Sequence, residues 1–139
     1  MTSFTKTSLV AAAALLIVAG AASAQTLKAD IPFAFHVADK TLPAGSYTVD
    51  RIADGPVYLL RNENGSGGAA ALGQAPHDPP KAWKAEGSPK LVFRCGESTC
   101  TLTDLWDGAR PAYGIGQRKN VDMGTRIAVV TMRPEGRAD

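Results

Sequence analysis

After its N-terminal segment, the chain consists of short runs of β-branched and aromatic residues that end at glycine, proline, asparagine or aspartate. The runs recur at intervals of about ten residues, which is the spacing of strands and tight turns in antiparallel sheets. The apolar spacing of an amphipathic helix is absent from this part of the sequence. We therefore predict an all-β fold, a single antiparallel β-sandwich of about seven or eight short strands, with a small β-barrel as the alternative.

The N-terminal segment has the three parts of a secretory signal peptide, which we expect to be helical. Lys6 lies near the start, an apolar run covers Leu9 to Ala19, and the small residues at 22–24 form a cleavage site. A membrane anchor is the rival interpretation, but the run is well short of the roughly 20 residues that cross a bilayer as a helix. We expect cleavage after Ala24, a mature start at Gln25, no membrane span after cleavage, and a periplasmic or secreted location.

This interpretation divides the chain into a cleaved signal peptide (1–24), one β-sandwich domain (25–133) and a disordered C-terminal tail (134–139). The formal net charge of +2 argues against a dedicated nucleic-acid binder, which would carry a concentrated basic face. The glycine-containing stretch at 114–119 lacks the third glycine of a dinucleotide fingerprint. No cofactor is therefore expected.

The two cysteines predict a disulfide. Cys95 and Cys100 enclose residues 96–99, which suit a four-residue hairpin loop that sets the two cysteines opposite each other. Exported thiols pair where geometry allows, and closing so short a ring contributes about 2 kcal/mol. A metal site is the alternative, but His36 and His77 are too far away in sequence to complete a zinc pattern.

Alternating apolar residues predict the individual strands. In the stretch 31–37 the large side chains share one face, and Pro32 places this strand at an edge or at its start, because proline cannot donate to a ladder. His36 then points to the opposite, solvent-facing side. Further strands are expected at 46–52, 57–61 and 69–74, on both flanks of the cysteine loop, and at 113–117 and 126–132.

Two tryptophans lie in or beside predicted loops. The proline-rich stretch from Pro76 to Pro89 is predicted to be a surface loop, with Trp83 either covering the edge of the core or exposed on a binding loop. After the cysteine hairpin, Asp104 breaks the alternation before Trp106, which predicts a β-bulge. Asp107 then begins a turn.

Four residues are candidate ligand contacts: Trp83, Trp106, Asp104 and Asp107. Two carboxylates beside a tryptophan suit a sugar-stacking site or a glycoside hydrolase, and the alternative is a bulge and a turn after a core tryptophan. His77 is followed by Asp78, an acid that is able to orient an imidazole, although loop polarity explains the pair equally well. No catalytic residue is assigned.

The segment 31–49 carries a recognisable pattern, IPFxFxV followed by LPAGxYxV. This pattern resembles the N-terminal signature of uncharacterised small secreted proteins of Acidobacteria-type soil bacteria, and the resemblance implies export and a β fold but no activity. A weaker likeness connects LPAGxYxV with transthyretin-like and Ig-like surface modules. The matching residues are Ile31, Pro32, Phe33, Phe35, Val37, Leu42, Pro43, Ala44, Gly45, Tyr47 and Val49.

These observations favour an exported, non-enzymatic binding or structural module of the cell envelope, with an unidentified envelope or extracellular partner. One alternative is a β-barrel carrier of a small apolar ligand, which requires an internal cavity. The other is a small envelope hydrolase acting on polysaccharide, which requires acidic residues that converge in a cleft. Two basic clusters are either solvated or in contact with an anionic envelope polymer: Lys81, Lys84, Lys90 and Arg94, and Arg118, Lys119 and Arg126.

Overall fold

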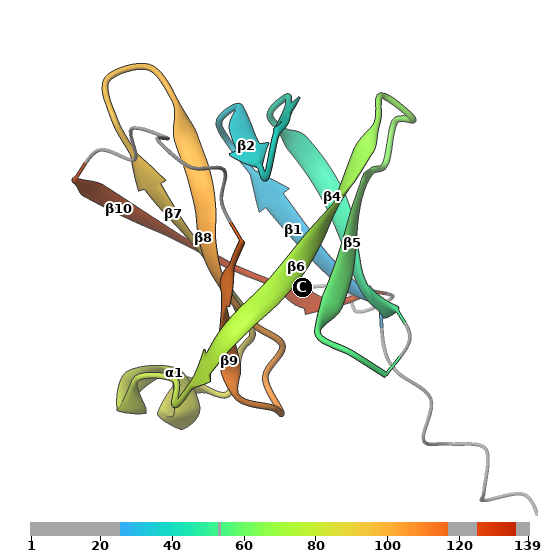
Figure 1. Cartoon of the computed structure of the whole chain (residues 1–139). Helices are drawn as coiled ribbons and strands as arrows, with labels where there is room; N and C mark the ends of the chain where they lie inside the picture. The colour runs from blue at the N-terminus through green and yellow to red at the C-terminus, as the bar shows by residue number, and fades with distance from the viewer. Residues whose placement is uncertain (1–25, 53, 117–124, 136–139) are drawn as a thin grey trace, which may run out of the picture.

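The computed structural model describes residues 26–52, 54–116 and 125–135. The expected signal peptide (1–24) lies outside these residues. Eleven strands and one short helix form in the described part, so the all-β prediction is confirmed (Figure 1). The elements are β1 Leu27–Ile31, β2 Phe35–Val37, β3 Lys40–Leu42, β4 Gly45–Ile52, β5 Val57–Asn62, β6 Gly68–His77, α1 Lys81–Glu86, β7 Lys90–Cys95, β8 Cys100–Trp106, β9 Ala112–Ile115, β10 Arg126–Thr131 and β11 Arg133–Pro134.

The strands form one open mixed sheet rather than a purely antiparallel one. Its path runs β10-β7-β8-β9-β6-β5-β4-β1-β11, and β2 joins it through a parallel pairing with β8 while also pairing with β3. The strand count exceeds the expected seven or eight because β2, β3 and β11 have only two or three residues each. Such short strands have no clear alternation in the sequence.

One long strand, β6, connects the two halves of the sheet and crosses between them in Figure 1. Its first half pairs with β5 and its second half with β9, with an irregularity between Gln74 and Pro76. The sequence predicted only a weak strand at 69–74. Small residues are required here because a Cβ on Gly73 would lie 2.8 Å from the Pro56 carbonyl oxygen.

Pro32 interrupts the stretch that was expected to form one strand at 31–37. The structure has β1 before the proline and β2 after it, and β1 lies between β4 and β11 rather than at an edge. The predicted alternation is confirmed, since Ile31, Phe35 and Val37 are buried. The chain breaks at Pro32 because that residue has no N–H for a ladder.

The C-terminal strands reach both ends of the strand path. β10 pairs with β7, and β11 pairs with β1, although only the buried Met132 separates β10 from β11. Pro134 was expected in a disordered tail but lies opposite Leu27, and the Glu135 N–H donates to the Thr26 carbonyl over 2.8 Å. A strand of two residues is too short to show alternation in the sequence. The predicted start of the tail at residue 134 was therefore too early. Residues 136–139 lie outside the described part.

The core is made of large side chains from both halves of the sheet. Phe35 on β2 meets Tyr47 on β4 and Phe93 on β7 edge to face, with ring centroids 5.3 and 5.4 Å apart. Each fully buried side chain of this size contributes about 1.5–3 kcal/mol through the hydrophobic effect. The largest fully buried side chains are Tyr47, Tyr58, Phe35, Phe93, Ile31, Leu60, Leu91, Leu102, Leu105, Met132, Val37 and Val49.

The cysteine hairpin has the expected form. Cys95 and Cys100 lie opposite each other in the β7–β8 register and are joined by a disulfide, with an S–S distance of 2.06 Å. The predicted bulge is also present, because Val92 pairs with Asp104 and Phe93 with Leu102, which leaves Thr103 as the extra residue.

The proline-rich stretch is not the continuous loop that was expected. β6 extends into it as far as His77, and α1 follows directly after Pro80. The helix consists of lysine, alanine, tryptophan and glutamate, mostly strong helix formers, and ends at Gly87 in the left-handed conformation (φ 77°). Six residues are too few to show helical periodicity in the sequence. No helix in the described part is long and apolar enough to span a membrane.

Candidate functional site

Helix α1 is held to the sheet by two tryptophans. The rings of Trp83 and Trp106 are stacked, with centroids 6.1 Å apart and an angle of 24° between the planes. Trp106 is buried at the end of β8, and its indole Nε1–H donates to the Arg110 carbonyl over 2.7 Å. Trp83 is half-buried, so this pair places a partly exposed aromatic surface at the α1 end of the molecule.

An ion pair between a buried lysine and a half-exposed glutamate fixes the other side of α1. Lys90 is only 4% exposed, and its Nζ donates to both carboxylate oxygens of Glu86 (2.8 and 2.9 Å) and to Thr131 Oγ1 (2.8 Å). Lys90 was expected among surface cations that are either solvated or in contact with an anionic polymer. The structure corrects this, because the ammonium group is occupied in joining α1, β7 and β10.

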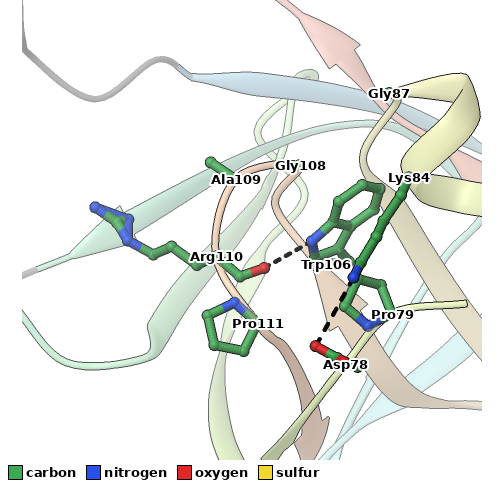
Figure 2. A pocket seen from close by; sticks show the side chains of 9 residues that line it. All are labelled: Asp78, Pro79, Lys84, Gly87, Trp106, Gly108, Ala109, Arg110 and Pro111. Carbon is green, nitrogen blue, oxygen red and sulfur yellow. Dashed lines mark hydrogen bonds and ion pairs between the residues drawn. The ribbon is translucent and has the colours of Figure 1, made fainter. Parts of the chain in front are cut away.

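A hollow of about 410 Å³ opens beside Trp106 (Figure 2). The apolar parts of its wall come from proline rings and the tryptophan, and the polar parts from Lys84 and Asp78, whose Nζ and Oδ1 atoms lie 3.9 Å apart. Both side chains are exposed, so this ion pair is weak and does not prevent either group from binding a ligand. The hollow is lined by Asp78, Pro79, Lys84, Gly87, Trp106, Gly108, Ala109, Arg110 and Pro111.

A second hollow of about 410 Å³ lies against the same turn. It shares Gly87, Gly108 and Ala109 with the first and continues to Met132 and Leu27, near the β1–β11 pairing. The turn after β8 therefore has a hollow on each side. This places the turn and the end of α1 at the centre of the candidate site.

Asp107 faces inward and organises that turn. Its Oδ1 accepts the N–H groups of Ala109 and Arg110, each over 3.0 Å, and its Oδ2 accepts the Tyr58 hydroxyl over 3.0 Å. Arg51 Nη1 lies 3.9 Å from the same Oδ2. Burial, and then the Asp107 charge, raise the pKa of Tyr58 above its ordinary value, so the phenol stays protonated and donates.

Asp104 has different partners. Its Oδ1 lies 3.4 Å from His77 Nε2, and its Oδ2 accepts the Thr103 hydroxyl over 3.1 Å. The acid beside the His77 ring is thus Asp104 on β8, whereas Asp78, the neighbour in sequence, offers only its backbone carbonyl to Nδ1 at 3.2 Å. The carboxylates of Asp104 and Asp107 are engaged in two separate networks.

The structure therefore brings two of the four candidate ligand contacts together and separates the other two. Trp83 and Trp106 form one stack, and of the four only Trp106 lines the hollow in Figure 2. Sequence reasoning missed Arg110 and Pro111, whose only signal was their position after the predicted Asp107 turn. It also missed Tyr58 as a partner of Asp107, because 49 residues separate the two.

Among the described residues, no three or more histidine, cysteine, aspartate or glutamate side chains are grouped so as to hold a metal ion. Comparison of the chain with protein-family models, curated proteins and solved structures gave no match.

Proposed function

We propose that this chain is an exported, non-enzymatic binding module of the cell envelope, and that its ligand is an acidic glycan held at the hollow beside Trp106. The observation that carries this proposal is the composition of that hollow, in which flat apolar walls are combined with exposed polar groups. Binding sites for small molecules have this character, with mostly apolar walls and a few polar groups that fix orientation.

The charges around the hollow favour an acidic ligand. Lys81 and Lys84 on α1 are exposed, and Arg110 is exposed on the turn opposite. Asp78 is the one carboxylate among the residues that line the hollow. Of the charged residues that line the hollow, Lys84 and Arg110 are cations and Asp78 is an anion. Arg110 Nη1 also lies 3.7 Å from Asp107 Oδ2, but the side chains of Lys84 and Arg110 are both half exposed, which suits uronic acid or other acidic sugar units.

Two further observations support binding over the alternatives. The carboxylates of Asp104 and Asp107 have separate structural partners, whereas glycoside hydrolysis needs two carboxyl groups that face one bond. Large buried rings such as Tyr47 and Phe93 occupy the interior, where an apolar carrier would hold its ligand. We also infer that the two halves of the sheet pack as a sandwich, supported by the contacts of Phe35 with both rings.

Binding is tested by calorimetric titration with two glycan probes. We expect acidic oligogalacturonate to bind and neutral cello-oligosaccharides of the same length to bind at least about tenfold more weakly. Lys84→Glu should weaken oligogalacturonate binding by a similar factor. Lys40→Glu on β3, a lysine remote from α1, is the control and should leave it unchanged. Equal affinity for both probes, or an equal effect of both variants, would contradict the proposed ligand.

Export is tested by the mass of the protein recovered from the producing cells. The disulfide supports export because such bonds persist in oxidising compartments. We expect the recovered protein to begin at Gln25 and to lack the mass of two hydrogens through the bond between Cys95 and Cys100. Recovery of the full chain from the cytoplasm would contradict this part of the proposal.

A further inference from the structure

Strand β10 has one edge that pairs with no other strand among the described residues, although β10 also contacts β1. Its six residues pair antiparallel with β7, from Arg126 opposite Cys95 to Thr131 opposite Lys90. In the strand path β10 has no second neighbour among the described strands, and Figure 1 shows it at the margin of the sheet. The backbone N–H and C=O groups along that margin are available to pair with another strand.

The side chains of β10 do not protect this edge. Ile127 is 58% exposed and Val129 is 48% exposed, and both point to the outer face of the sheet, where Val92 lies opposite Val129. Natural edge strands are usually blocked by charges, prolines or bulges. The stretch from Ile127 to Val130 contains none of these.

We propose that β10 pairs antiparallel with β10 of a second copy of this chain, about a two-fold axis that lies midway between Ala128 and Ala128 of the second copy. Directly opposed residues of an antiparallel pair share a face, so a two-fold axis perpendicular to the sheet must lie midway between one residue of the strand and the same residue of the second copy. With the axis at Ala128, Ile127 lies opposite Val129 of the second copy, and Val129 lies opposite Ile127.

The sequence of β10 is complementary to itself in this register. The two apolar pairs extend the outer row that begins with Val92, so the exposed parts of Ile127 and Val129 cover each other. The only charged residue of the strand, Arg126, lies opposite Val130 of the second copy, so the pairing opposes no like charges. An axis at Val129 would instead place Ile127 opposite Thr131, with less apolar contact.

The oligomeric state tests this interface directly. Light scattering over a concentration series of the mature protein should show a dimer that dissociates on dilution. Val129→Lys should raise the dissociation constant at least about tenfold, because it places two ammonium groups within the apolar row. Leu72→Lys on β6 is the matched control, since Leu72 is equally exposed (53%) but remote from β10, and it should leave the dimer unchanged.

Crosslinking tests the register independently of the lysine variants. The native cysteines are joined to each other, so an introduced cysteine is the only free thiol. Ala128→Cys should form a covalent dimer under mild oxidation because residue 128 faces its own copy across the axis, whereas Thr131→Cys should not. A monomer at every concentration, a dimer that Val129→Lys leaves intact, or equal crosslinking at both positions would overturn the proposal. None of these results depends on the glycan-binding hollow.

Discussion

Asp107 shows how one turn residue connects distant parts of this molecule. Its two oxygens bind the backbone of its own turn and the hydroxyl of Tyr58 on β5. Arg51 on β4 pairs with Tyr58 in the strand register, and its Nη1 atom lies beside the same carboxylate. The carboxylate therefore holds the floor of the candidate site to the half of the sheet that contains β4 and β5.

Removing the Tyr58 hydroxyl should destabilise the fold without changing its shape. Tyr58→Phe loses a buried hydrogen bond to a charged group, so we expect the free energy of unfolding to fall by about 1.5–3 kcal/mol in urea titrations. Tyr113→Phe is the control, because no hydrogen bond of the Tyr113 hydroxyl is seen within the described residues, and we expect a change within about 0.5 kcal/mol. Equal losses in the two variants would contradict the role of the Asp107 bond.

The same tyrosine makes stability depend on alkaline pH. The folded-state pKa of Tyr58 is raised, chiefly by burial, so the folded protein holds a proton that the unfolded chain releases above about pH 10. Its contribution is complete below that pH and is lost as the pH rises toward the folded value. Urea midpoints should therefore fall more steeply above pH 10 in the native protein than in Tyr58→Phe.

The cysteine pair was fully predictable from sequence because all the relevant information is local. Replacing Cys95 and Cys100 together with alanine should lower the free energy of unfolding by about 2 kcal/mol, since the unfolded chain loses its short ring. Urea titration measures the loss, and Ser98→Ala within the same loop should remain within about 0.5 kcal/mol of the native value. Unchanged stability of the double variant would show that the bond does not constrain the unfolded chain.

At the level of elements, helix α1 depends on its contacts with the sheet. A helix of six residues is not stable on its own, so the Trp83–Trp106 stack and the Glu86–Lys90 pair must hold it in place. The sequence could not predict this element, because the residues that fix it lie on other strands. Alternation did predict the strands and the bulge that surround Cys95 and Cys100, where Leu91, Phe93 and Cys95 share one buried face.

The ion pair between Glu86 and the buried Lys90 should contribute to the stability of the fold. Glu86→Ala should lower the free energy of unfolding by about 1–3 kcal/mol, because it leaves the ammonium group of Lys90 buried with only Thr131 as a partner. Lys90→Met keeps a similar volume without the charge and should cost less. Adding Lys90→Met to Glu86→Ala should then recover part of the loss, as measured by thermal unfolding. A double variant less stable than Glu86→Ala alone would contradict this account.

Across the whole molecule, the sequence predicted the class of fold but not the order of its strands. Alternation identified Ile31, Phe35 and Val37 as buried, whereas it could not assign the faces of Val57–Asn62, which is apolar on both. The pairing of β1 with β11 joins residues from opposite ends of the chain. Short strands such as β11 have too few residues to form a pattern. The candidate site was likewise only partly predictable, because it combines α1, a turn and the C-terminal strands.

Deleting residues 133–139 should therefore destabilise the whole fold. The deletion removes the pairing of β11 with β1 and the ion pair between Arg133 and Asp30, and we expect a loss of about 2 kcal/mol from the lost hydrogen bonds. Deleting only 136–139 keeps every described pairing and should have little effect. Thermal unfolding of the two truncated proteins distinguishes the contributions, and equal midpoints would contradict a structural role for β11.

The position of β10 and β11 on either side of Met132 determines when folding can finish. A polypeptide that passes through a translocation pore with its N-terminus first presents β1 at the outset, yet the second neighbour of β1 is among the last segments to emerge. Contacts between residues so distant in sequence also form slowly. In the export that we propose, β1 therefore cannot pair with β11 until the last strand has left the pore, so the chain remains unfolded enough to be translocated until then.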